Sequence, residues 1–386
     1  RFTPCYPTVV DLLSNAIDGA PDATGLVLDL RGNPGGFGAT ASGVARLLLD
    51  VEAELGVMKL RKDEMRFIAF PAPNAFRGPV VILVDEATGS TSEILAAGLK
   101  DLGRVRVVGR STMGAALPSV VEKLPGGWRL LTVIADFKTA SGTRVEGPGV
   151  APDVVVTLDS AAFAGGRDPD VDAALAALPT APTIETWNKP TPAAAVVAET
   201  AEKRAVVVDD EAAAWMTRWV DALGGEAALR QKVSMKTTSR VETMGLKLRS
   251  IATSDGNGRL RVETEMGALG RSIQVVNDDG VFEASTLQGV RELTGGEAAL
   301  TRRSAIPGGE AAWRETFAKV EFMGRKARDG KEFAVLRRTP HPNEGEPETI
   351  YLDLETALPV HTEGKIKTPQ AEMETSSVVE SWRKFD

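Results

Sequence analysis

The sequence predicts an α/β layered domain followed by a β-rich domain, and two contrasting patterns in the chain support this prediction. In the first half, short apolar runs alternate with segments whose apolar residues recur every three or four positions. From about residue 204 onward, short alternating segments are separated by turn signals. The first pattern is typical of parallel strands joined by helices, and the second is typical of an antiparallel sheet.

The predicted parallel strands are residues 25–30, 79–84 and 105–109, whose continuous apolar character indicates burial on both faces. Between them we expect helices at residues 40–51 and 91–102, connected by right-handed crossovers. The same reasoning predicts a further strand and a closing helix at residues 128–137 and 168–178.

A segment rich in proline, alanine and threonine separates the two patterns. Residues 179–203 contain four prolines, which break regular structure, so we interpret them as a linker. The predicted domains are therefore residues 1–178 and residues 204–386.

The second domain begins with one amphipathic helix at residues 209–225, which ends in two glycines. Alternating segments follow, separated by turns such as Asp255-Gly256 and Asp329-Gly330, and they predict an antiparallel meander with few helices. The motif GGEAA recurs at irregular spacing, so we expect a turn into a short helix rather than a repeat array. Its copies lie at residues 224–228, 295–299 and 308–312.

Composition excludes several classes of protein. The 386 residues carry a net charge of −8, which argues against a general nucleic-acid binder. A single cysteine, Cys5, excludes an internal disulfide and a cysteine-based zinc site. No apolar run approaches the roughly 20 residues of a membrane span. The chain starts at Arg1 rather than at a methionine and carries no signal peptide, so we expect a fragment with functional residues upstream.

A serine lies where a buried strand turns into a helix. The strand ends near Asp85, and the helix begins near Thr91. Ser90 is the best-placed hydroxyl in the turn, because parallel sheets carry reactive groups at the carboxyl ends of their strands. The helix N-terminus would supply N–H groups to a developing oxyanion. The alternative interpretation is an N-cap serine bonded to the N–H of Ser92 or Glu93.

A glycine turn follows another predicted strand, in the sequence Asn33-Pro34-Gly35-Gly36. Glycines allow close backbone approach and can aim N–H groups at a substrate carbonyl. A plain strand-to-helix turn explains the same residues.

Four motifs occur in a characteristic order along the first domain: LDLRGNPGG, VDEATGSTSEILAAGL, VVGRSTMG and VEGPGVAPDV. Together they resemble the tail-specific, or C-terminal processing, serine peptidases, over roughly residues 1–178. The resemblance implies a crotonase-like α/β core and cleavage of peptide bonds in unfolded proteins or peptide tails. It implies no metal or organic cofactor, and it implies an exported protein of the periplasm or cell envelope.

The resemblance also implies roles for individual residues. Ser90 matches the nucleophile of the family. The turn at Gly35 and Gly36, together with the N–H of Thr91, matches the oxyanion hole.

One departure from the family concerns the general base. In the Ser–Lys branch a lysine follows the glycine of the motif T-x-G-K-G, but residues 112–116 read TMGAA and place Ala115 there. Ser119 stands where that branch has glutamine. Alanine cannot accept a proton, so a Ser–Lys dyad that uses this turn is excluded. Lys123 lies farther along, and we interpret it as a solvated charge.

The other branch resembles tricorn-type peptidases and uses Ser, His and Glu. Glu146 matches its glutamate, which precedes a GV-x-PD segment, although an exposed loop carboxylate is the alternative. The histidine of that branch would lie upstream of Arg1. The chain contains only His341 and His361, for which we expect packed or solvated roles.

Two rival functions follow from the same residues. A catalytically degenerate protein with this fold would bind polypeptide tails without cutting them. Residues 36–41 also fit the dinucleotide pattern G-x-G-x-x-A, but residues 31–35 separate the strand end from its first glycine.

The β-rich domain is similar in pattern to the half-barrel folds of periplasmic lipoprotein carriers. This similarity implies an open curved sheet that holds a lipid or another apolar ligand, although ordinary core positions explain the same side chains. The candidate lining residues are Met235, Met244, Met266, Phe282 and Phe322.

Overall fold

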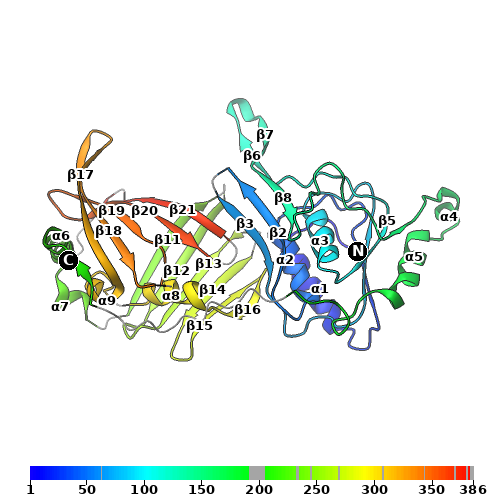
Figure 1. Cartoon of the computed structure of the whole chain (residues 1–386), viewed down its shortest axis with the longest axis horizontal. Coiled ribbons are helices and arrows are strands. Elements are labelled where there is room, and N and C mark those ends of the chain that lie inside the picture. The colour runs from blue at the N-terminus through cyan, green and yellow to red at the C-terminus, as the bar shows by residue number, and fades with distance from the viewer. Residues whose placement is uncertain are drawn as a thin grey trace.

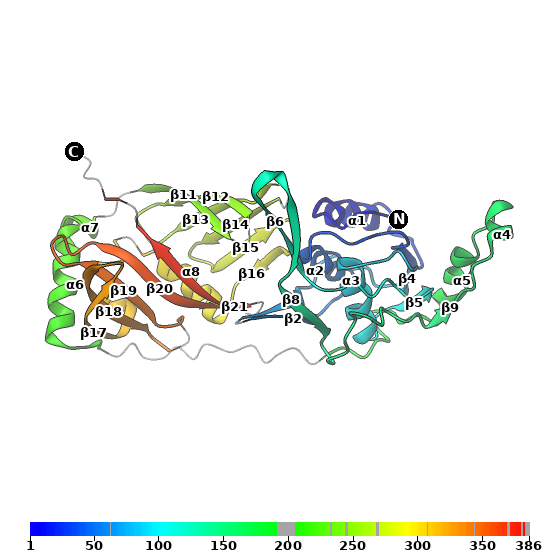
Figure 2. The ribbon, with the colours of Figure 1, turned by 90° about the horizontal axis from the view of Figure 1, so that it is seen from above.

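The computed structural model describes residues 1–61, 63–190, 205–231, 234–243, 246–267, 270–306, 308–342, 344–368, 371–379 and 381–382. Within these ranges an α/β core lies at one end of an elongated molecule and the β-rich part lies at the other (Figures 1 and 2). This arrangement confirms the predicted order of an α/β core followed by a β-rich part.

A four-stranded parallel sheet forms the centre of the core, in the order β1-β4-β5-β9. The predicted strands are confirmed, and all residues of β4 are buried, as expected of a central parallel strand. The strands are β1 (Leu26–Asp29), β4 (Val80–Val84), β5 (Arg106–Gly109) and β9 (Val154–Val155).

Helices cover both faces of this sheet. Ile82 and Val84 of β4 pack into the cluster that holds the first three helices, whereas Val81 and Leu83 pack against the last one. This alternation follows from the two-residue period of a strand. The helices are α1 (Thr8–Asp18), α2 (Ala39–Ala45), α3 (Thr91–Asp101), the short α4 (Ser160–Ala164) and α5 (Pro169–Ala177).

One helix prediction needs correction, and one further helix was not predicted. The predicted helix 40–51 is shorter, because α2 tightens into a 3₁₀ turn, η1 (Arg46–Leu48), and the chain becomes extended at Leu49. Helix α1 was not predicted, although its sequence is amphipathic and buries Val9 and Val10.

A second, nine-stranded sheet runs through both parts of the chain. Its order is β10-β17-β18-β19-β20-β21-β3-β2-β8, and β21 joins the two parts by pairing antiparallel with β3. Three strands come from the first domain: β2 (Ala53–Leu60), β3 (Glu64–Ala69) and β8 (Ala135–Thr139). The other six are β10 (Val207–Val208), β17 (Phe317–Arg328), β18 (Lys331–Pro340), β19 (Glu348–Asp353), β20 (Pro359–Lys367) and β21 (Ala371–Val378).

The predicted strand 128–137 is two strands. It divides at Ile134 into β7 (Arg129–Val133), which pairs with β6 (Ser119–Lys123), and β8, which pairs with β2. The β6–β7 hairpin, closed by the 3₁₀ turn η2 (Pro125–Gly127), projects from the body of the molecule (Figure 1). One apolar run thus serves two different sheets, which its period alone does not reveal.

The β-rich part contains a second antiparallel sheet of six strands in sequence order, which confirms the predicted meander. Its strands are β11 (Met235–Thr243), β12 (Leu246–Ser254), β13 (Leu260–Glu265), β14 (Arg271–Val276), β15 (Val281–Ser285) and β16 (Gly289–Glu292). The helices of this part are α6 (Asp210–Ala222), α7 (Glu226–Leu229), α8 (Gly295–Ser304) and α9 (Trp313–Thr316). The first and third GGEAA copies lead through a turn into α7 and α9, as predicted, whereas the second copy forms the first residues of α8 itself.

The first part of the predicted linker packs against the core. A 3₁₀ turn, η3 (Leu178–Thr180), is followed by the buried residues Ile184 and Trp187. The buried guanidinium of Arg104 donates hydrogen bonds to main-chain carbonyls, including that of Pro182 at 2.8 Å. Burial lowers the pKa of Arg104 to about 10. Residues 191–203 lie outside the described ranges.

Among the described residues, no helix combines the length and the apolar character that crossing a bilayer requires.

Candidate active site

The turn between β4 and α3 holds Ser90 in an uncommon backbone conformation. Ser90 has φ 52° and ψ −122°, caps the N-terminus of α3 and is half-buried. A positive φ in a residue with a side chain costs roughly 1–3 kcal/mol, so the surrounding structure must hold it in place. Such residues cluster at functional sites.

Glu93 supplies much of that support from the first turn of α3. Its carboxylate is fully buried and accepts hydrogen bonds from the N–H of Ser90 at 2.9 Å and the hydroxyl of Thr112 at 2.5 Å. It also accepts from the N–H groups of Gly114 at 2.7 Å and Ala115 at 3.0 Å. One carboxylate therefore ties the serine turn to the neighbouring turn of residues 112–115.

The glycine turn after β1 packs directly on Ser90. Gly35 has φ +94°, and a Cβ placed on it would lie 2.6 Å from the Cβ of Ser90 and 2.8 Å from the N of Thr91. A side chain at this position is therefore excluded by both the backbone conformation and the contact. The sequence hypothesis that the Gly35 turn and Ser90 belong to one site agrees with this close approach.

The main-chain N–H groups of this turn differ in what they bind. The N–H of Gly35 donates to Oδ1 of Asn33 at 3.0 Å. Within the described part of the chain, the N–H groups of Gly36 and Thr91 have no hydrogen-bond acceptor, and Gly36 is exposed. The hydroxyl of Thr91 donates to the carbonyl of Gly36 at 2.9 Å, which holds the two residues together.

The N-terminal segment supports the glycine turn from its other side. The N–H of Cys5 donates to the carbonyl of Gly35 at 2.9 Å, and the N–H of Phe37 donates to the carbonyl of Cys5 at 2.8 Å. The Cys5 thiol is buried 3.3 Å from the hydroxyl of Ser92. Burial raises the pKa of this thiol, so it is a packed neutral group at pH 7.

Glu146 lies beside the same neighbouring turn. Its Oε2 accepts hydrogen bonds from the N–H of Ala116 at 2.8 Å and the N–H of Leu117 at 3.2 Å. The carbonyl of Ala115 accepts a hydrogen bond from the N–H of Ser90 at 3.1 Å. Glu146 and Ser90 thus contact adjacent residues of one turn, and the carboxylate is half-buried rather than an exposed loop charge.

The two histidines lie in the β-rich part. His361 is on β20, where its Nε2 lies 2.9 Å from the Glu363 carboxylate, and His341 follows β18. Both side chains are about 95% buried, at 4% and 5% exposure. The expectation of packed roles therefore agrees with their burial.

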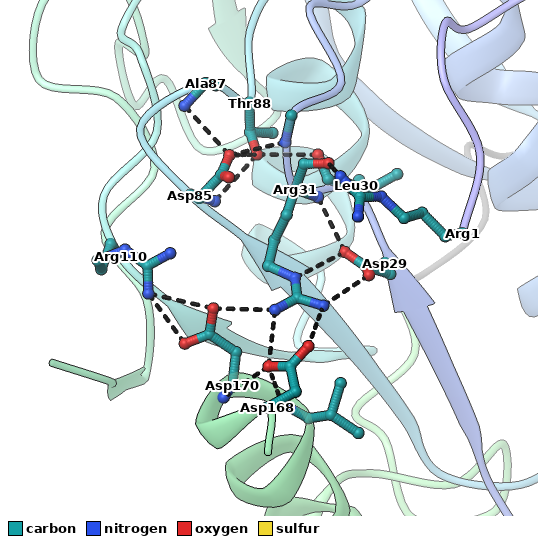
Figure 3. Close-up of polar contacts among 12 residues, drawn as sticks. Arg1, Asp29, Leu30, Arg31, Asp85, Ala87, Thr88, Arg110, Asp168 and Asp170 are labelled. Atoms are coloured by element: carbon teal, nitrogen blue, oxygen red, sulfur yellow. Dashed lines mark hydrogen bonds and ion pairs between the residues drawn. The ribbon is translucent and has the colours of Figure 1, made fainter. Parts of the chain in front are cut away.

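An ion-pair network lies at the end of β1 (Figure 3). Arg31 donates two hydrogen bonds to the Asp29 carboxylate, at 2.9 and 2.8 Å, and two to Asp168, both at 2.9 Å. It donates a further one to Asp170 at 3.0 Å, and Arg110 pairs with the same buried carboxylate at 2.9 Å. Paired arginine–carboxylate bonds of this kind are geometrically specific, so the network fixes α5 against the strand end.

This network shifts the pKa values of its members. Hydrogen bonds to Asp29 and Asp168 outweigh burial and raise the pKa of Arg31. Burial acts to raise the pKa of Asp29, but hydrogen bonds from Arg31 leave it below its ordinary value. Hydrogen bonds from Arg31 also lower the pKa of Asp168. All three groups are therefore charged at pH 7.

Sequence reasoning missed Glu93 and Asn33 as parts of the site. Glu93 follows Ser90 at the spacing S-x-x-E, which is a helix-start signature, but that pattern does not reveal the bonds to Thr112 and Gly114. Asn33 is fully buried, and its Nδ2 donates to the carbonyl of Phe2 at 2.8 Å. No short-range signal marks either of these long-range contacts.

The proposed apolar lining residues of the β-rich part do not share one environment. Met235 is 59% exposed, whereas Phe322 packs against the cluster around α6. Met266 and Phe282 are half-buried. Met244 lies outside the described residues.

Comparison with known proteins finds relatives of the α/β core. Residues 8–156 match the model of peptidase family S41. The match covers less than half of the chain and shows that this segment is similar to that family. The matched segment contains strands β1 to β9. Ser90, Glu146 and the Gly35 turn all lie within it.

The curated relatives of this matched segment are processing proteases. The carboxyl-terminal-processing protease of Picosynechococcus is 36% identical over 138 residues, which cover 36% of this chain and 33% of that protein. The carboxy-terminal processing protease CtpA of Bacillus subtilis is 28% identical over 160 residues, which cover 41% of this chain and 34% of that protein. The chain therefore spans about one third of the length of these relatives.

Two solved structures are also similar to this chain. The photosystem II D1 C-terminal processing protease is 29% identical with a TM-score of 0.37, covering 45% of this chain and 46% of that one. The tricorn protease is 26% identical with a TM-score of 0.32, covering 40% of this chain and 15% of that one.

Proposed function

We propose that this protein is a serine endopeptidase of the C-terminal processing type, which hydrolyses peptide bonds in unfolded proteins or peptide tails. The observation that carries the proposal is the contact of the Gly35 turn with Ser90. It brings a half-buried serine close to the N–H groups of Gly36 and Thr91, which have no acceptor among the described residues. A hydroxyl near N–H donors that are free to bind an oxyanion suits acyl transfer.

In this proposal Ser90 Oγ attacks the scissile carbonyl carbon, and the carbonyl oxygen becomes an oxyanion. The N–H groups of Gly36 and Thr91 donate to that oxyanion. Gly35 acts through its missing side chain, since its own N–H is donated to Asn33. The C–N bond then breaks, the amine leaves with the proton taken from Ser90, and water hydrolyses the acyl-enzyme.

The general base of the proposal is a histidine from outside this chain, supported by Glu146. Hydrogen bonds from Ala116 and Leu117 hold the Glu146 carboxylate in place, so it can orient an imidazole and stabilise its charged form. Ala115 occupies the position of the lysine in the Ser–Lys branch, which favours the Ser–His–Glu branch.

The proposal also covers the type of fold and the location of the protein. The core would be crotonase-like, and the β-rich part would be a half-barrel with an apolar ligand. The protein would act in the periplasm or cell envelope, on polypeptide rather than nucleic acid.

A tail-binding protein without catalysis is the second candidate. It is favoured by Ala115, which removes the base that the Ser–Lys branch needs. The discriminating feature is a histidine encoded upstream, which the enzyme requires and the binding protein does not.

The test is hydrolysis of casein by the full-length protein, compared with its Ser90→Ala variant. We expect cleavage that falls at least about 10³-fold on substitution, because the nucleophile is lost. The matched control is Ser160→Ala, at an exposed position on α4, which should cleave like the parent. If the folded parent and Ser90→Ala are equally inert on several unfolded substrates, the tail-binding function replaces the peptidase.

A further inference from the structure

One side chain of the β-rich part is buried in the α/β core. Leu287, between β15 and β16, is 9% exposed and belongs to the same apolar cluster as Val10 and Val44. It lies a hundred residues or more from every other buried member of that cluster in sequence. The β-rich part therefore contributes a side chain to the core that carries Ser90.

Leu287 meets the core where helices α1 and α2 cross. Gly43 of α2 is packed so tightly there that an added Cβ would lie 2.7 Å from Cγ2 of Val10 and 3.1 Å from the carbonyl oxygen of Leu287. The turn thus contacts α2 directly at the point where α2 also contacts α1.

Both helices lead straight to the proposed oxyanion turn. Helix α2 starts after Gly38, two residues beyond Gly36. Helix α1 follows the segment of Cys5, whose main chain pairs with Gly35 and Phe37. A hydrogen bond of 3.4 Å from the Thr40 hydroxyl to the carbonyl of Cys5 joins the two elements again. A shift of either helix would therefore move the N–H of Gly36.

Charged residues fix the Leu287 turn against the core. On β16, Arg291 forms half-buried ion pairs with Glu283 at 2.7 Å and Glu297 at 2.9 Å, and its guanidinium lies 4.2 Å from the ring centre of Phe70. The buried side chain of Arg46 lies against Gly289 at the end of the same turn. These contacts hold the turn in one position, so the Leu287 side chain is held firmly in its place in the core.

We propose that Leu287 is a positioning residue for the Ser90 site: it acts through α1 and α2 to hold the N–H of Gly36 in its oxyanion-binding position. The catalytic part of the inference rests on the proposed peptidase function. The mechanical part, that Leu287 orders the glycine turn, stands on the packing alone.

The mechanical part is tested by hydrogen exchange of backbone amides in the full-length protein. In Leu287→Ala we expect exchange in residues 33–45 to be roughly tenfold faster or more, because the cavity frees α2. Leu287→Met, which preserves volume, should restore slow exchange. Val290→Ala is the matched control, since Val290 lies on β16 of the same hairpin and is 69% exposed.

A second variant tests the contact from the core side. Gly43→Ala leaves Leu287 intact and inserts a methyl group between Val10 and the Leu287 turn. Gly43→Ala should also accelerate exchange in residues 33–45. It keeps the proposal testable if Leu287→Ala fails to fold.

The catalytic part is tested by covalent labelling of Ser90 with a peptidyl phosphonate, together with casein kinetics. We expect Leu287→Ala to be labelled roughly tenfold more slowly or worse, with kcat lowered and KM within about twofold, because only the transition-state oxyanion loses a donor. A loss of overall fold would instead lower the fraction of labelled protein and leave its rate unchanged.

The outcomes separate the two ideas. Unchanged exchange in residues 33–45 overturns the positioning role, whatever the activity. Faster exchange with an unchanged labelling rate also overturns it, because the turn would then not limit the chemistry. A parent protein whose Ser90 is never labelled overturns the peptidase function, while faster exchange in Leu287→Ala would still support the mechanical coupling.

Discussion

The two sides of the candidate site are held by different kinds of contact. On the Gly35–Ser90 side, the fully buried side chains of Asn33 and Glu93 bind several main-chain groups each. On the Glu146 side, the carboxylate is half-buried and its bonds go to the main chain of a turn whose Ala115 is exposed.

This difference separates two tasks of a serine peptidase. In the proposed function, binding an oxyanion requires fixed donors, which the Gly35–Ser90 side would supply. Moving a proton requires a base, and the Glu146 side offers only a group that would orient one. In the proposed function, the Gly35–Ser90 side would bind the reacting carbonyl group, and Glu146 would orient the base.

The largest expected effect comes from breaking the ordered side with Gly35→Ala. A methyl group here would meet the Cβ of Ser90 and the N of Thr91, in a backbone conformation with φ +94°. We expect casein hydrolysis by the full-length protein to fall roughly 10²–10³-fold, as when an oxyanion donor is lost.

Its control separates contact from backbone strain. Gly142 has a similar φ of +90° but nothing within 4 Å of an added Cβ. Gly142→Ala should therefore lose stability through backbone strain and keep its rate. Equal losses of rate in the two variants would contradict a specific role for the Gly35 contact.

The next effect concerns the buried carboxylate that ties the two turns together. Glu93→Gln keeps the shape but replaces one acceptor oxygen with an NH₂ group that faces N–H or O–H donors. We expect the free energy of unfolding to fall by about 2–4 kcal/mol, measured by urea denaturation, because buried donors lose a charged acceptor.

Glu86→Gln is the matched control for this change. Glu86 lies in the turn before Ser90, but its side chain is 67% exposed and pairs with Arg110 at the surface. An exposed pair contributes at most about 1 kcal/mol. A Glu93→Gln variant no less stable than Glu86→Gln would show that the buried carboxylate does not order the site.

The smallest effect is the pH dependence of the ion-pair network at the end of β1. The pKa values of Asp29 and Asp168 are lowered in the folded protein, so the unfolded chain binds protons first as pH falls. Their contribution is present above the unfolded pKa of about 4 and is lost as pH falls through the lower folded values.

Asp168→Asn tests this contribution, since asparagine can still cap α5. We expect it to unfold at lower urea than the parent at pH 7, by about 1–2 kcal/mol after allowance for the partly exposed carboxylate. The difference should shrink below pH 4. Asp172→Asn, on the exposed side of the same helix, should show almost no difference at any pH, and a pH-independent loss in Asp168→Asn would argue against the ion pair.

Several features of the fold follow from local sequence patterns. The three buried parallel strands, helix α3 and the antiparallel meander are predicted from spacing alone, because burial on one or two faces leaves a period in the chain. The strand pair β2–β3 and helix α1 were missed. The run 128–137 was read as one strand, because its apolar residues do not show that the chain changes sheets at Ile134.

The sequence by itself determined where Ser90 stands, at a strand-to-helix turn, and that Ala115 cannot serve as its base. Only the tertiary structure decided which groups hold that serine. Arg31 and Asp168 are 137 residues apart, Cys5 and Ser92 are 87 apart, and Leu287 reaches the core from the β-rich part. The reason is physical. Local periodicity records which face of an element is buried, whereas the partners of buried polar groups and of a core side chain such as Leu287 are the residues that folding brings near them.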